Sequence, residues 1–178
     1  MMNALVLLIG GNQGDRLALI NHATGLIRER IGSVVASSRI YETEPWGSFS
    51  ADGGEVPPFM NQGLLVETDL TAHEALREAL AIEAVLGRVR PAGAAAATPS
   101  HGKVTASQRI YHSRPIDIDL IFWNDEVIDT PDLTIPHPRM HLRRFVLEPL
   151  AEFMPQYVHP ILGKTVCQML AELPVGSA

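Results

Sequence analysis

Two acidic side chains stand close together in the segment over residues 114–123, in a spacing that suits metal-dependent phosphate chemistry. Branched aliphatic and aromatic residues fill the rest of this segment, and they predict a buried β-strand. Because alternate side chains of a strand share one face, Asp117 and Asp119 are expected to point the same way, with Cα atoms roughly 6.5–7 Å apart. The aliphatic residues beside them are expected to bury the opposite face: Ile116, Ile118 and Leu120.

This acid pair has two physical interpretations. Neighbouring carboxylates repel each other unless a cation lies between them, and hard oxygen ligands suit Mg²⁺, which completes its shell with water and substrate phosphates. Arg114 precedes Asp117 by three residues and adds a group that binds phosphate. A solvent-facing acid pair on an antiparallel strand would show the same spacing. The acid pair alone therefore leaves both interpretations open, and the flanking arginines favour the metal site.

Composition limits the class of protein. The chain has 178 residues, 46% of them hydrophobic, and a formal net charge of −6. We expect one domain over residues 1–178 with a substantial core, and no nucleic-acid partner. The single cysteine, Cys167, excludes an intrachain disulfide and favours a reducing, cytoplasmic setting. The apolar run over residues 4–9 is too short for a membrane span, so no membrane partner is expected.

The order of expected elements predicts the fold that must position these side chains. Strands are expected over residues 4–10, 33–41, 59–68 and 114–123, and helices after the N-cap Asp15 and after a capping box of Thr71 and Glu74. The second helix is expected to bury a broad apolar stripe of Leu76, Ala79, Leu80, Ile82, Ala84, Val85 and Leu86. Short extended pieces and two further helical segments follow, over residues 126–128, 133–135, 145–154 and 164–173. The order β-α-β-β-α-β predicts an α+β, ferredoxin-like split βαβ sandwich. It would have four mainly antiparallel strands, two helices on one face, and a C-terminal extension.

A second pair of residues suggests a flat ligand. Phe59 and Asn61 are again two positions apart on an expected strand, so they share a face. A ring that stacks beside an amide with one donor and one acceptor suits a heteroaromatic compound. Single aromatic residues are nevertheless most often part of the core.

Together these stretches resemble a known family, the 6-hydroxymethyl-7,8-dihydropterin pyrophosphokinases of folate biosynthesis. The resemblance runs in order from Ala4 to about Leu150. The matching stretches are Ile9-Gly10-Gly11-Asn12, Tyr41-Glu42-Thr43-Glu44-Pro45-Trp46-Gly47, Phe59-Met60-Asn61, Glu83 with Gly87-Arg88-Val89-Arg90, Arg114-Pro115-Ile116-Asp117-Ile118-Asp119-Leu120, and Pro136-His137 with Met140, Arg143, Phe145 and Pro149-Leu150. The Arg-x-x-Asp-Ile-Asp motif followed by Pro-His is specific. The similarity implies a transferase that moves a pyrophosphoryl group from ATP to the pterin hydroxymethyl group and releases AMP.

The resemblance also implies roles on the ATP side. Asp117 and Asp119 would hold two Mg²⁺ ions, and Arg88 and Arg114 would contact the ATP phosphates. These four are the implied catalytic residues. The remaining ATP-binding residues would be Glu83, His137 and Arg143, although the helical pattern alone favours a solvated acid at Glu83.

On the pterin side, the resemblance implies a sandwich of the ring between Phe59 and Phe145. Asn61 and the backbone near Thr43 and Trp46 would bind the edge of the ring. The implied partners are the two small-molecule substrates, and the chain is expected to act as a monomer. The loops over residues 48–58 and 91–108 flank these residues and are expected to close over a filled site.

Three other interpretations stay open. Another metal-dependent phosphoryl or nucleotidyl transferase, such as a nuclease, would share the acid pair but would need a basic groove. A non-catalytic ferredoxin-like ligand-binding module would need no metal. His137 and His141 are four residues apart, as zinc ligands on a helix often are, but a third ligand of the usual kind is not close in sequence.

Overall fold

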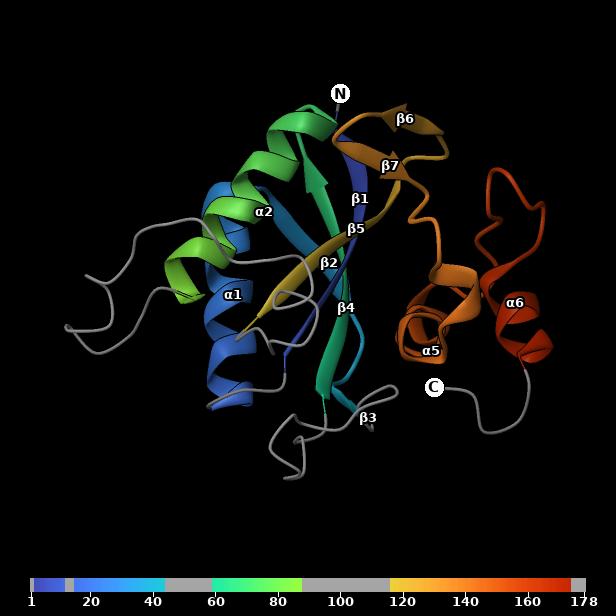
Figure 1. Ribbon diagram of the computed structural model, residues 1–178, viewed down its shortest axis with the longest axis horizontal. Coiled ribbons are helices and arrows are strands. Elements are labelled where there is room, and N and C mark those ends of the chain that lie inside the picture. The colour runs from blue at the N-terminus through green and yellow to red at the C-terminus, as the bar shows by residue number, and fades with distance from the viewer. Residues whose placement is uncertain (1, 12–14, 44–58, 88–115, 174–178) are drawn as a thin grey trace, which may run out of the picture.

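The computed structural model describes residues 2–11, 15–43, 59–87 and 116–173. A twisted antiparallel sheet forms its centre, with helices on both sides (Figure 1). The strands are β1 (Asn3–Gly11), β2 (Ser33–Ser37), β3 (Tyr41–Thr43), β4 (Phe59–Thr68) and β5 (Asp117–Trp123). Their order is β2-β4-β1-β5, and β3 also pairs with β4. This order confirms the predicted ferredoxin-like arrangement.

Helices α1 (Arg16–Arg30) and α2 (Ala72–Gly87) cover one face of the sheet, as predicted. Helices α5 (Arg144–Phe153) and α6 (Val166–Glu172) cover the other face and form the C-terminal extension. Two separate cores result, one beneath each pair of helices. Strand β1 contributes alternate residues to both cores, which explains why its sequence is apolar without interruption.

The helix ends follow the predicted capping chemistry. The Asp15 carboxylate accepts the Ala18 N–H at 3.1 Å at the start of α1. Thr71 and Glu74 bond each other's backbone N–H groups at 3.1 and 2.8 Å before α2, which confirms the capping box. Along the chain, β5 is followed by the separate hairpin of β6 (Ile128–Thr130) and β7 (Leu133–Ile135) and by the 3₁₀ turn η2 (Met140–Leu142), before α5 begins.

Two expectations need correction. The single strand predicted over residues 33–41 is two strands, β2 and β3, both paired with β4. In α2 the predicted buried stripe is narrower than expected, because Leu80 and Val85 are 52% and 43% exposed. The loops over residues 48–58 and 91–108 lie outside the described residues. In the part of the chain that the structure describes, no helix is long and apolar enough to cross a membrane.

Candidate active site

The acid pair lies on β5 with the geometry expected of a strand. Asp117 pairs with Gly10 and Asp119 pairs with Leu8 on β1, so both carboxylates belong to the face that α5 covers. Both side chains are half-buried. The neighbouring aliphatic residues are buried in the core beneath α1 and α2: Ile116, Ile118 and Leu120. The predicted division of this strand into two faces is therefore confirmed.

A cleft of about 300 Å³ runs beside β5, which ends the strand order of the sheet. Strand β5 contributes Asp117 and Asp119, α2 contributes Glu83, and the segment after β7 contributes His137. Four residues singled out in the sequence thus line one cavity. The other lining residues are Leu76, Leu80, Ile118, Leu120, Asp132, Leu133, Thr134 and Pro138.

Glu83 stabilises the edge of the site. Its Oε2 accepts the backbone N–H of Ile118 at 2.6 Å, between the two aspartates. The N–H groups on the outer side of an edge strand lack a neighbouring strand, and a carboxylate satisfies one of them here. Glu83 is therefore not the solvated helix acid that the helical pattern favours. Its bond to Ile118 places a third carboxyl group in the cleft beside the acid pair.

His137 enters the cleft as a neutral ring. Its backbone N–H donates to the Ile121 carbonyl at 3.1 Å, and its Nδ1 accepts the Arg139 N–H at 3.2 Å. Burial, followed by the positive charges of Arg143 and Arg139, lowers the pKa of His137. With Nδ1 accepting, the neutral ring carries its proton on Nε2 and can donate to a ligand oxygen.

Asn61 lies on the same face of the sheet as the acid pair. It is 4% exposed and pairs with Gly10, which in turn pairs with Asp117. Two strand spacings of about 4.8 Å separate Asn61 from Asp117. The contact with Gly10 is close, because a Cβ added there would lie 2.2 Å from Asn61 Oδ1. Asn61, Gly10 and Asp117 therefore form one row of paired residues across the sheet, with the amide at one end and the acid pair at the other.

Two other residues predicted to bind the pterin, Phe59 and Thr43, lie at this end of β4. Phe59 shares its strand face with Asn61 and pairs with Thr43 of β3. Phe145 lies in the first turn of α5 and packs on the core of that side. The Arg143 guanidinium lies 5.6 Å from the centroid of the Phe145 ring. Three predicted site residues lie outside the described part of the chain: Trp46, Arg88 and Arg114.

The cleft also has an apolar wall, supplied by α2 and β7, that the sequence motifs do not predict. The helical pattern predicts a buried Leu80, yet its exposed side chain lines the cleft. Leu133 and Thr134 precede His137 by four and three residues, so their nearness to a predicted ligand residue was the available signal. In the ranges that the structure describes, no three His, Cys, Asp or Glu side chains gather to hold a metal ion by themselves.

A family model described as 7,8-dihydro-6-hydroxymethylpterin-pyrophosphokinase (HPPK) matches residues 6–155 of this chain. The chain belongs to this family. A Porphyromonas gingivalis 2-amino-4-hydroxy-6-hydroxymethyldihydropteridine pyrophosphokinase is 36% identical over 160 residues, which cover 89% of this chain and 95% of the relative. The Methylorubrum extorquens protein of that name is 36% identical over 93% of this chain and 90% of its own. HPPK enzymes transfer pyrophosphate from ATP to 6-hydroxymethyl-7,8-dihydropterin in folate biosynthesis, giving AMP and the pterin diphosphate, and so does this one.

Solved structures show the same HPPK fold. A crystal structure of an HPPK-DHPS in complex with substrates has a TM-score of 0.67 and 16% identity, and the match covers 96% of this chain and 43% of that one. Wild-type Plasmodium falciparum HPPK-DHPS with pteroate has a TM-score of 0.65 and 17% identity, over 96% of this chain and 42% of that one. This chain therefore corresponds to less than half of those longer proteins. The family assignment supports neither the nuclease-like interpretation nor the non-catalytic one.

Proposed function

We propose that pyrophosphoryl transfer takes place in the cleft beside β5, with Asp117 and Asp119 as its metal ligands. The observation that carries this proposal is the convergence of these two carboxylates with Glu83 and His137 in one cavity. The four residues come from α2, β5 and the segment after β7, which are far apart in the sequence. A surface acid pair without function would give no reason for this convergence.

The residues present fit Mg²⁺. Two half-buried carboxylates on a rigid strand offer hard oxygen ligands, and the limited number of protein ligands leaves positions for water and phosphate oxygens. When bound, the two expected Mg²⁺ ions would neutralise charge on the ATP phosphates, which is the main need of phosphoryl-type transfer. Asp117 and Asp119 would hold them.

The protein groups of the nucleotide side then bind and orient ATP. Glu83 keeps the backbone between the two aspartates in place through its bond to Ile118. Neutral His137 donates from Nε2 to an oxygen of the nucleotide without adding positive charge. The guanidinium groups assigned to the phosphates and nucleotide are those of Arg88, Arg114 and Arg143.

The pterin ring would lie at the other end of the row across the sheet. Asn61 would supply one donor and one acceptor to the ring edge, with Phe59 and Phe145 as the stacking residues. The backbone near Thr43 and Trp46 would complete the edge contacts. We further propose a single domain that acts as a monomer in the cytoplasm, without a nucleic-acid partner.

Ligand-dependent thermal unfolding tests this assignment. Ligand that binds only the folded state at 100 times its Kd stabilises that state by about 2.7 kcal/mol. Mg²⁺ with a non-hydrolysable ATP analogue should therefore raise the Tm of the wild-type protein clearly. Asp117→Asn and Asp119→Asn should lose most of this rise while keeping the pterin-induced rise. An unchanged response to Mg²⁺ and the analogue in both variants would show that the acid pair does not bind the metal.

A further inference from the structure

On the edge of β4 opposite β1, the chain pairs first as β2 and then as β3, and the pairing is interrupted between these two strands. From Ser37 to Tyr41 the chain advances four residues, while β4 advances only three between their partners Leu64 and Asn61. One extra residue in a strand makes a β-bulge, which bends the strand and changes the direction of its side chains. The Ser38 N–H still donates to the Gly63 carbonyl of β4 at 2.9 Å, but the Arg39 N–H that follows needs a partner outside the ladder.

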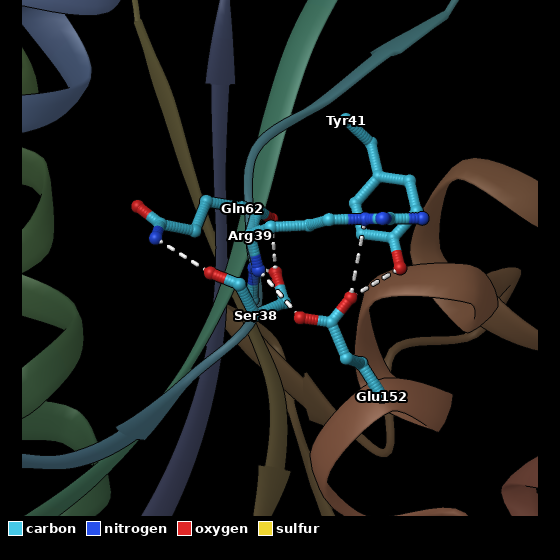
Figure 2. A network of polar contacts seen from close by, with 6 residues as sticks. Ser38, Arg39, Tyr41, Gln62 and Glu152 are labelled. Carbon is cyan, nitrogen blue, oxygen red and sulfur yellow. Dashed lines mark hydrogen bonds and ion pairs between the residues drawn. The ribbon is translucent and has the colours of Figure 1, made fainter.

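Glu152 of α5 supplies such a partner (Figure 2). Its Oε1 accepts the Arg39 N–H at 2.7 Å, and its Oε2 accepts the Tyr41 hydroxyl at 2.5 Å. The Arg39 Nε lies 3.5 Å from the same carboxylate, and the Arg39 guanidinium lies 4.9 Å from the centroid of the Tyr41 ring. The Tyr41 hydroxyl and the Arg39 N–H lower the pKa of Glu152, so its carboxylate is charged at neutral pH.

Ser38 fixes the other side of the bulge to β4. Its Oγ accepts the Gly63 N–H at 3.0 Å, and its carbonyl accepts the Gln62 side-chain amide at 2.7 Å. The bulge is thus held between β4 and α5. The register that follows it pairs Tyr41 with Asn61 and Thr43 with Phe59. Every residue of β3 therefore stands beside the stretch of β4 assigned to the pterin.

We propose that Glu152 is a positioning residue for pterin binding. It acts through Arg39 and Tyr41, not by contact with substrate, and it keeps β3 in register with β4. This register sets the backbone of Thr43 at a fixed place relative to the Asn61 amide, and both would bind the same ring edge. The inference rests on the proposed pterin site. A residue that only stabilised the fold would change the Tm and leave the KM of the folded enzyme unchanged.

Steady-state kinetics with each substrate varied in turn test this role. Glu152→Ala should raise the KM for the pterin about tenfold, with kcat and the KM for ATP changed less than about twofold. Glu152→Gln should keep the KM for the pterin close to the wild-type value. Its amide oxygen can accept the Arg39 N–H while its amide NH₂ group donates to the Tyr41 oxygen. The matched control is Glu172→Ala at the end of α6, which breaks the exposed ion pair of Glu172 with Lys164 (2.7 Å) and should change neither KM.

Two further variants make the outcome decisive. If Glu152→Ala fails to fold, Tyr41→Phe removes only one hydrogen bond to the carboxylate and should still raise the pterin KM. An unchanged pterin KM in the folded variant would overturn the inference. Asn61→Ala in the same series tests the pterin site itself. A raised KM in Asn61→Ala with an unchanged KM in Glu152→Ala rejects only the positioning role, whereas an unchanged KM in Asn61→Ala rejects the proposed site.

Discussion

Gly10 lies between the residue assigned to the pterin edge and those assigned to the metal. It pairs with Asn61 on one side and with Asp117 on the other. Because Gly10 has no side chain, the Asn61 amide can lie directly over it, on the side of the sheet that carries the acid pair. A ring held at Asn61 could therefore extend its hydroxymethyl group toward phosphates bound near Asp117 and Asp119, which is the geometry that the transfer needs.

Gly10→Ala should damage both stability and pterin binding. The added Cβ would lie 2.2 Å from Asn61 Oδ1 and 2.8 Å from the Met60 carbonyl oxygen, and the backbone atom cannot rotate away. We expect a loss of about 1–3 kcal/mol in the free energy of unfolding, with weaker pterin binding measured by calorimetry. Gly25→Ala is the control, since its Cβ meets nothing within 4 Å in α1, and it should be neutral or stabilising. Unchanged pterin affinity in Gly10→Ala would contradict this account of the sheet surface.

At the residue scale, side-chain direction was predictable and tertiary partners were not. The shared face of Asp117 and Asp119 follows from the two-residue period of a strand, which needs no knowledge of the fold. The role of Glu83 depends on the outer N–H of Ile118, and that group exists only because β5 is at the edge of the sheet. Helical periodicity contains no information about a neighbouring strand edge, so it favoured a solvated acid.

At the element scale, the limits of β4 were predictable and the bulge between β2 and β3 was not. Residues 59–68 form β4 as expected, because their apolar run and flanking breaks are local signals. The alternation over residues 33–41 looks continuous, yet the pairing with β4 inserts an extra residue. The partners that hold the bulge are Glu152, more than 100 residues away, and Gln62 on β4. Long-range partners of this kind leave no local pattern.

The connection from α5 to α6 is a turn held by His159. This side chain is 4% exposed, and its Nδ1 accepts the N–H groups of Ile161 and Leu162 at 3.2 and 3.1 Å. Burial, and then the charge of His141, lower the pKa of His159 below its ordinary value of 6.5. Protonation of Nδ1 would also remove the acceptor of both N–H groups, so the turn requires the neutral ring.

The stability of the protein should therefore fall in mild acid. The unfolded chain binds a proton at His159 more readily than the folded one, so this contribution is present above about pH 6.5 and decreases as the pH falls toward the lower folded pKa. The pKa of His137 is lowered too, so this residue also makes the folded state less stable as the pH falls. His159→Asn keeps a side-chain acceptor without a proton equilibrium. It should reduce the loss of unfolding free energy between pH 7.5 and 5.5, measured by urea denaturation.

The control for this prediction is His22→Asn, which makes the same change on the exposed surface of α1. It should leave the pH dependence as it is in the wild-type protein. An identical pH dependence in His159→Asn and the wild type would show that the turn is not the source of acid sensitivity.

At the scale of the whole molecule, the sheet separates two packing layers with different tasks. The core beneath α1 and α2 buries the aliphatic face of β5, so the carboxyl groups of Asp117 and Asp119 lie on the opposite face. The core beneath α5 and α6 lies on the face that carries Asn61 and the acid pair, Phe145 packs against it, and α5 carries Glu152. The order of elements predicted the first layer, because βαβ connections place both helices on one face. The second layer was predicted only as an extension, since short helices after a sheet do not indicate where they pack.

The most direct test of the central claim is a product assay with purified protein, ATP, 6-hydroxymethyl-7,8-dihydropterin and Mg²⁺. The wild-type enzyme should form AMP and the pterin diphosphate in equal amounts, and chelation of the metal should stop both. Asp117→Asn and Asp119→Asn should each lose most of this turnover while remaining folded, whereas Asp129→Asn on the exposed strand β6 should retain it. Near-normal AMP formation by both Asp117→Asn and Asp119→Asn would contradict the assignment of the acid pair as the metal-binding centre.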